Sequence, residues 1–197
     1  MTFEMNRRGL LVSLSAAALA ACTTPPPSPR FPQLTFSHLP PFRLDAQTLD
    51  VVDGFRATSR ADVASGMPVP PAVSARQWAN DRLVPLGNSG SIVFTITEAS
   101  VIETKLERAK GVRGVVTNDQ SERYDGKLAA KISVRDPARQ RSGEVSAEAT
   151  RSRTVPENLS LNERDKIWFD ITEALINDLN SELEKSINQF LQPFLIR

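Results

Sequence analysis

Two stretches in which apolar and polar residues alternate strictly constrain the fold of this chain more than any other feature. Their apolar positions are Leu128, Ala130, Ile132, Val134, Val145, Ala147 and Ala149. A period of two residues is typical of a strand that has one buried face and one solvated face. The polar stretch between them, residues 136–143, predicts the loop of an antiparallel hairpin.

Folding these strands about the centre of residues 136–143 predicts their register. Val134 then lies opposite Val145 on the apolar face, and Lys131 lies opposite Glu148 on the polar face. A slip of one residue would turn the apolar side chains to water, so the pattern specifies the two faces strongly.

The C-terminal part of the chain predicts one long helix from Ser160 to about Leu191. Ser160 and Glu163 form a capping-box pattern at its start, and an apolar stripe follows at helical spacing. The stripe consists of Ile167, Ile171, Ala174, Leu175, Leu179, Leu183, Ile187, Phe190 and Phe194. We interpret the stripe as packing on the chain's own sheet, with a coiled coil or a partner helix as the alternative.

The chain ends in an apolar tail after Pro193. Phe194, Leu195 and Ile196 cannot continue the helix beyond this proline, so the tail either docks on the folded body or contacts a partner. These three residues are therefore the candidate partner contacts.

Weaker patterns predict the elements before the hairpin. Residues 42–52 predict a first strand, and Ser74 to Leu83 predict a short helix that begins with a capping box of Ser74 and Gln77. Ser91 to about Leu106 predict a long strand.

Glu98 interrupts the apolar face of that long strand, which indicates a bulge or a bend. Residues 58–71 and 108–120 predict loops because they are rich in turn-forming residues.

The order strand, helix, three strands, helix predicts an α+β fold. Adjacent strands with helices on one side favour a two-layer sandwich. We expect an antiparallel four-stranded sheet with two helices on one face (β-α-β-β-β-α), and with Trp78 and Trp168 packed between helix and sheet.

The N-terminal segment has the features of an export signal that ends on the only cysteine of the chain. Arg7 and Arg8 precede an apolar run, and Leu19-Ala20-Ala21-Cys22 closes it. The run is much shorter than the roughly 20 residues of a membrane-spanning helix. Residues 1–21 are therefore predicted to be a signal peptide.

The tetrapeptide Leu19-Ala20-Ala21-Cys22 resembles a bacterial lipobox. The resemblance implies cleavage before Cys22 and covalent attachment of a diacylglycerol and an N-acyl chain to that residue. Three acyl chains hold a protein on a membrane essentially permanently. Translation begins at Met1 or Met5, and the paired arginines leave both the general secretory route and the twin-arginine route open.

Residue 23 is Thr rather than Asp, and by resemblance to enteric lipoproteins this favours the periplasmic face of the outer membrane over the inner membrane. Residues 22–41 are rich in proline and predict a lipidated, semi-rigid tether. Residues 42–197 are then the periplasmic α+β domain.

A lipobox, a proline-rich tether and this order of elements resemble small auxiliary lipoproteins of envelope transport. Examples are the LPS-assembly lipoprotein and the auxiliary lipoproteins of ABC-type lipid transporters. The resemblance implies a non-catalytic accessory of an envelope protein complex, with lipid transport as its setting. The alternative is a carrier that binds a lipid or amphiphile in a groove between the helices and the sheet.

Composition argues against several other classes. Removal of residues 1–21 takes Arg7, Arg8 and Glu4 from totals of 24 basic and 23 acidic residues, so the remainder is balanced and does not predict nucleic-acid binding. One histidine, His38, and one cysteine cannot form a His-based triad or a zinc site.

A catalytic pair of carboxylates is the remaining route to an enzyme, and Glu98 and Glu103 are the candidates considered. Glutamates at strand breaks are ordinarily solvated. We therefore expect no enzyme activity, no metal and no cofactor beyond the acyl chains on Cys22.

Overall fold

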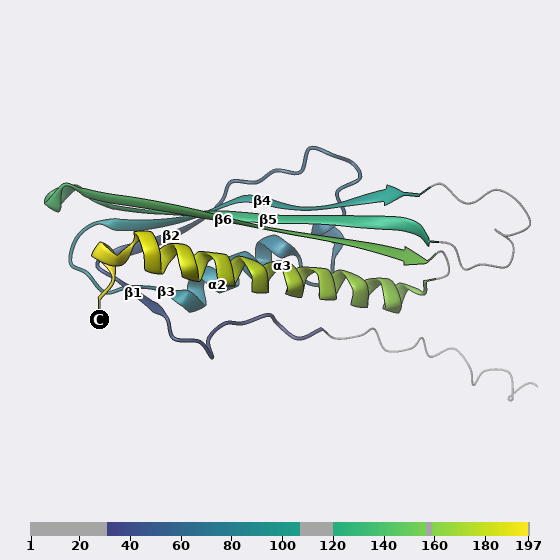
Figure 1. The fold of residues 1–197 in the computed structure, drawn as a ribbon, viewed down its shortest axis with the longest axis horizontal. Helices are drawn as coiled ribbons and strands as arrows, with labels where there is room; N and C mark the ends of the chain where they lie inside the picture. Colours follow the sequence, from purple (N-terminus) through teal and green to yellow (C-terminus); the bar gives the residue numbers. More distant parts are fainter. Residues whose placement is uncertain (1–30, 107–119, 157–158, 197) are drawn as a thin grey trace, which may run out of the picture. The chain divides into compact units, whose positions relative to one another are not determined.

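The computed structural model describes residues 31–106, 120–156 and 159–196. Two α-helices and six strands follow one another along this part of the chain (Figure 1). They are β1 (Phe42–Leu44), β2 (Thr48–Asp53), α2 (Pro71–Arg82), β3 (Leu83–Pro85), β4 (Ser91–Lys105), β5 (Gln120–Asp136), β6 (Arg141–Pro156) and α3 (Leu161–Phe190). None of these helices is long and apolar enough to cross a membrane.

The main sheet has the order β2-β4-β5-β6 and is mixed. β5 pairs antiparallel with both β4 and β6, whereas β2 runs parallel to β4. The prediction of a fully antiparallel sheet is therefore wrong at β2. α2 lies between β2 and β4 in the chain, and such a crossover returns the chain to the end at which the previous strand began.

Both helices cover the same face of this sheet (Figure 1). The ring of Trp78 on α2 lies 5.6 Å from the ring of Phe94 on β4. α3 packs on β5 and β6, where a Cβ at Gly126 would lie 2.9 Å from the Leu175 side chain. The prediction of two helices on one face is confirmed.

The segment predicted as one first strand, residues 42–52, forms two strands. β1 ends at Leu44 and pairs in parallel with β3, while β2 begins at Thr48 and pairs with β4. The backbone N–H of Asp45, which lies between these two strands, donates to the carbonyl of Phe194 at 2.8 Å.

α2 begins earlier than predicted, at Pro71, and has no capping box. Proline is favoured at the first helical position because its fixed φ suits the helix and its missing N–H would have no helical partner. Ser74 lies inside the helix and is buried, with its hydroxyl 3.5 Å from the Pro70 carbonyl. The capping box of Ser74 and Gln77 is therefore wrong.

The long strand and its irregularity are confirmed. β4 spans Ser91–Lys105, and its pairing with β5 shifts register between Ile96 and Glu98. Asp62 in the preceding loop pairs with Ile102 beyond the end of β2. Most of the predicted loop 108–120 lies outside the described residues.

The hairpin forms, but its register differs from the prediction by two residues. Ile132 lies opposite Val145, and Val134 lies opposite Gly143. The connection is a short 3-10 turn, Pro137–Arg139, followed by Gln140 at φ 51°. Because a shift of two residues preserves the strand period, each side chain keeps its predicted face.

α3 begins as predicted. The Glu163 N–H donates to the Ser160 hydroxyl at 3.3 Å, and the Ser160 N–H donates to the Glu163 carboxylate at 2.9 Å. The apolar stripe faces the sheet along most of its length. Phe190 is the exception, since 59% of it is exposed.

The space between the helices and the sheet is filled by large apolar side chains. Trp78 is fully buried, and its Nε1 donates to Asn180 of α3 at 2.8 Å. Trp168 is half-buried, with its ring edge against Tyr124 at a centroid distance of 5.9 Å. Both tryptophans lie on the helical side of the sheet, as predicted.

Candidate functional site

The residues of the predicted lipid anchor, Leu19, Ala20, Ala21 and Cys22, lie outside the described residues. The structure describes the chain from Phe31 onward and shows how it joins the folded body. We define residues 31–39 as the N-terminal segment.

The N-terminal segment packs on both helices. The ring of Phe31 stacks on the ring of Phe169 of α3 at a centroid distance of 5.1 Å, and Phe36 is 5% exposed. Asp81 of α2 accepts the Phe36 N–H and the Thr35 hydroxyl, each at 2.7 Å. The segment therefore belongs to the body, although it lies within residues 22–41, for which the sequence predicts a lipidated, semi-rigid tether.

The hydrogen bonds at Asp81 lower the pKa of its carboxyl. Partial burial acts to raise the pKa of this carboxyl, but the bonds from Phe36, Thr35 and Gln77 outweigh it and hold the pKa below the ordinary value. Asp81 is therefore an anion at neutral pH, and charge-assisted hydrogen bonds hold the segment on α2.

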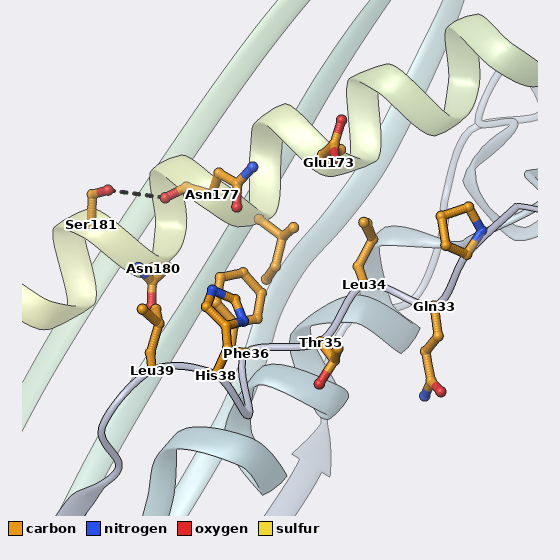
Figure 2. A pocket seen from close by; sticks show the side chains of 12 residues that line it. Gln33, Leu34, Thr35, Phe36, His38, Leu39, Glu173, Asn177, Asn180 and Ser181 are labelled. Carbon is orange, nitrogen blue, oxygen red and sulfur yellow. Dashed lines mark hydrogen bonds between the residues drawn. The ribbon is translucent and has the colours of Figure 1, made fainter.

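A cavity of about 420 Å³ lies between the N-terminal segment and α3 (Figure 2). Phe36, His38 and Leu39 reach toward it from the segment, and polar side chains of α3 line its other side. The described residues hold no group of three or more metal-ligating side chains, here or elsewhere.

A second cavity, of about 350 Å³, is mainly apolar. It lies between the first turn of α2, the loop after β2 and the inner face of the sheet. Its lining includes Phe55, Ala72 and Ala99. Among the cavities found in the described part, this one corresponds best to the predicted groove between helix and sheet, and its volume is at the low end for ligand sites.

The C-terminal tail docks on β1. Leu195 pairs with Leu44, and the Ile196 N–H donates to the Arg43 carbonyl at 2.8 Å. Phe194 is 4% exposed, so it is part of the core. Of the two predicted alternatives the structure has the docked tail, and of the three candidate partner contacts Ile196 is the most exposed.

An ionic cluster, defined as Asp45, Asp136, Arg139 and Arg141, ties this end of the body together. Arg141 donates to Asp45 at 2.8 Å and to Asp136 at 3.1 Å. Arg139 reaches the same two carboxylates at 3.0 and 3.1 Å. The cluster thereby joins the hairpin turn to the connection between β1 and β2.

The arginines lower the pKa of both carboxyls in the ionic cluster. The hydrogen bond from Arg141 is the main cause at Asp45. At Asp136 burial acts in the opposite direction, but hydrogen bonds from Arg141, Ser89 and Arg139 together outweigh it. Both groups are anions at neutral pH, which is what a structural ion network requires.

The outer edge of β6 is open. β6 is the last strand in the sheet order, and within the described residues no strand or loop pairs with its far side. It is 16 residues long, against roughly 5–6 for an ordinary strand. Proteins usually shorten, bend or cover such an edge because its free N–H and C=O groups accept another strand.

The face of the sheet away from the helices is polar and electrically balanced. Lys127 lies 3.0 Å from Glu148, and Lys131 lies 3.4 Å from Glu144. These contacts join the charges of β5 to those of β6, so they do not create a field of one sign.

The two candidate catalytic carboxylates do not form a pair. Glu98 lies opposite Ala129 and Glu103 lies opposite Tyr124, so both are on the same strand. Since strand residues alternate between faces, the odd separation of these two glutamates places them on opposite faces of the sheet.

Sequence reasoning missed the N-terminal segment and the ionic cluster. A signal for the segment was present, since apolar residues recur among the prolines at Phe31, Leu34, Phe36 and Leu39. The sequence contains no such signal for the ionic cluster, because Asp45 is far from the hairpin turn along the chain.

Comparison with known proteins gives solved structures that are distant from this chain in sequence. No protein-family model and no curated protein matches the chain. The crystal structure of a minor lipoprotein from Acinetobacter baumannii is 11% identical with a TM-score of 0.36, and the match covers 78% of this chain and 98% of that one. A dodecamer of PelC from Paraburkholderia phytofirmans is 10% identical with a TM-score of 0.22, covering 71% and 88%. Likenesses at this level carry no argument about fold or function.

Proposed function

We propose that this chain is a lipid-anchored, non-catalytic accessory protein that docks on a protein complex of the cell envelope. Acyl chains on Cys22 hold it at the periplasmic face of the outer membrane, and lipid transport is the setting that we favour for the complex. The motif Leu19-Ala20-Ala21-Cys22 supports the anchor.

The open edge of β6 is the observation that carries the docking role. An extended segment of a partner adds to such an edge through main-chain hydrogen bonds, and side chains on alternate positions give specificity. β6 contains no proline before its last residue, and its pairing with β5 is regular from Glu122 to Asp136. Proline and bulges, two of the usual protections of an edge strand, are therefore missing over most of its length, while charged side chains such as Glu148 and Arg151 remain.

The anchor is tested by replacing Cys22 with serine. The acylated wild-type protein is expected in the membrane fraction, and Cys22→Ser in the soluble fraction, since serine is not acylated. A Cys22→Ser protein that remains with the membranes after a high-salt wash contradicts the anchor.

The docking role is tested by placing a charge on the open edge. Thr150 on β6 and Thr97 on β4 are both exposed strand residues. Acylated wild-type protein is crosslinked in envelope membranes and purified, and its partners are identified by mass spectrometry. Thr150→Lys is expected to lose a partner that Thr97→Lys keeps, because a lysine on an edge strand opposes further pairing. Equal capture by both variants refutes docking at this edge.

The apolar cavity beside α2 supports a second candidate function, a carrier of a lipid or amphiphile. In that case a soluble protein beginning near Arg30 carries bound lipid, visible by native mass spectrometry. Ala72→Phe fills the cavity and is expected to abolish the bound mass. Protein that is free of lipid when purified without detergent excludes the carrier.

A further inference from the structure

The mainly apolar cavity beside α2 has the size and the lining of a site for one alkyl chain. Small side chains from the loop after β2, from α2 and from β4 surround it, namely Ala57, Ala64, Ala72 and Ala99. A cavity of about 150 Å³ accommodates a benzene ring, so the volume of about 350 Å³ has room for roughly a dozen carbon atoms. One chain fits this space, and the two chains of a phospholipid do not.

Val73 connects the cavity with the surface. It lines the cavity from the first turn of α2 and is 53% exposed. Arg76 follows three residues later on the same helix, so its side chain lies next to that of Val73. The opening of the cavity therefore combines an apolar surface with a cationic side chain.

Two guanidinium groups and one carboxylate lie at this opening. Asp53 lines the cavity from the end of β2, and its carboxylate lies 3.7 Å from Nη2 of Arg76 and 3.9 Å from Nη1 of Arg56. Both separations are too long for a hydrogen bond. Arg56 donates to the backbone carbonyls of Asp53 and Phe55, and Arg76 has no hydrogen bond within the described residues. Arg76 therefore keeps free donors, and the three groups together carry one positive charge.

The second carboxylate in the lining, that of Asp62, has a structural role. Its Oδ1 accepts the backbone N–H groups of Ala64 and Val101, each at 3.0 Å. These bonds hold the loop after β2 on β4, and Asp62 forms an ion pair with neither Arg56 nor Arg76. The donors of Arg76 thus remain available to a ligand.

We infer that this cavity takes a single acyl chain with an anionic head, and that Arg76 and Arg56 bind the head. The inference rests on the carrier function proposed for the same cavity and names its class of ligand. A free fatty acid and a lysophospholipid with a terminal phosphate share this chemistry. A hydrogen bond from a guanidinium to an anionic head is stronger than one to a neutral head, so the opening selects the anion.

The test uses photoreactive probes and the full acylated protein in vesicles of phosphatidylcholine. Each probe carries a diazirine at the end of its chain, and mass spectrometry identifies the residues that it labels. Dodecanoate and lauroyl lysophosphatidate are the two single-chain anions. Dodecanol has the same chain with a neutral head, and dilauroyl phosphatidate has an anionic head with two chains.

We expect both single-chain anions to label the lining at Ala72 and Ala99, and dilauroyl phosphatidate to leave it unlabelled. Dodecanol should label the lining about fivefold less than dodecanoate, and Arg76→Gln should reduce labelling by the anions about threefold. The same variant should leave labelling by dodecanol unchanged, which separates the loss of the charge from a loss of folding. Arg135→Gln, at an exposed position of β5, is the matched control and should change neither probe.

The remaining outcomes separate the inference from the carrier function. Equal labelling by dodecanol and dodecanoate overturns the anionic head, and labelling by phosphatidate overturns the single chain; the carrier function survives both. Labelling by only one of the two anions supports the inference and identifies the source of the head. Absence of labelling by every probe, or labelling at Ala99 that persists in Ala72→Phe, shows that the cavity holds no chain, and the carrier function falls with the inference.

Discussion

Some charged side chains of this protein are buried, and Arg82 is the clearest case. Its side chain is 2% exposed, and its guanidinium lies 4.7 Å from the centre of the Phe42 ring. One nitrogen donates to Glu184 at 3.2 Å, while Nε and Nη1 have no partner among the described residues. Burial lowers the pKa of Arg82, and Glu184 opposes that effect.

Removal of the Glu184 charge alone is therefore expected to reduce the unfolding free energy more than removal of the Arg82 and Glu184 charges together. Glu184→Gln leaves the buried guanidinium without a counter-ion and should reduce the unfolding free energy by about 1–2 kcal/mol, less than for a fully buried pair because Glu184 is half-exposed. Adding Arg82→Met to that variant should restore part of the loss. Chemical denaturation measures the unfolding free energy of both variants. A Glu184→Gln variant that is as stable as the wild type contradicts the prediction.

The ionic cluster predicts a loss of stability in acid. The pKa of Asp136 is lower in the folded protein than the ordinary 3.8, so its contribution is complete above that pH and is lost as the pH falls through the lower folded value. The stability difference between wild type and Asp136→Asn should therefore be constant near neutral pH and shrink below about pH 4. A difference that stays constant down to about pH 3 refutes this role.

Gly143 permits the tail to approach β6 closely. A Cβ at this position would lie 2.8 Å from the side chains of both Leu191 and Phe194. Gly143→Ala is expected to reduce the unfolding free energy by about 1–3 kcal/mol because the core must shift. The matched control is Gly66→Ala, since no atom lies within 4 Å of its Cβ position, and thermal unfolding of this variant should be unchanged or slightly improved.

At the scale of elements, the two helices begin by different mechanisms. α3 begins with a capping box, whose pattern is local and was recognisable in the sequence. A similar pattern at Ser74 predicted a start that does not exist, because Pro70 and Pro71 just before it already provide one.

Ser160→Ala should reduce the unfolding free energy by about 1 kcal/mol, because it leaves the Glu163 N–H without its side-chain acceptor. Ser181→Ala is the matched control, since Ser181 lies in the middle of the same helix and donates only to the Asn177 carbonyl. Urea denaturation of both variants measures the difference. Equal stability of the two variants would show that the cap contributes nothing.

The hairpin shows which of its properties depend on neighbouring residues alone. Alternation assigned each residue to a face correctly, because that assignment depends only on the period. The loop length was misjudged, since Asp136 accepts the Arg139 N–H and allows a tight 3-10 turn. Register follows from the turn geometry, so the error in the loop became an error of two residues in the pairing.

At the scale of the whole molecule, the N-terminal segment completes the helical layer. Removal of residues 31–40 takes Phe36 from the core and leaves the Asp81 carboxylate without its donors from the segment. A soluble protein that begins at Pro41 should therefore melt at a lower temperature than one that begins near Arg30, and should bind a hydrophobic dye. Identical melting temperatures would show that the segment is only a tether.

The sequence by itself determined the class of the fold, the faces of the strands, the bulge in β4 and the long C-terminal helix. Each of these depends on residues close together in the chain, where period and capping chemistry act. The tertiary structure alone decided the parallel pairing of β2, the division of the first strand and the docking of both the N-terminal segment and the C-terminal tail. These depend on contacts between distant residues such as Asp45 and Arg141, or Thr35 and Asp81, and chain order does not encode which distant groups meet.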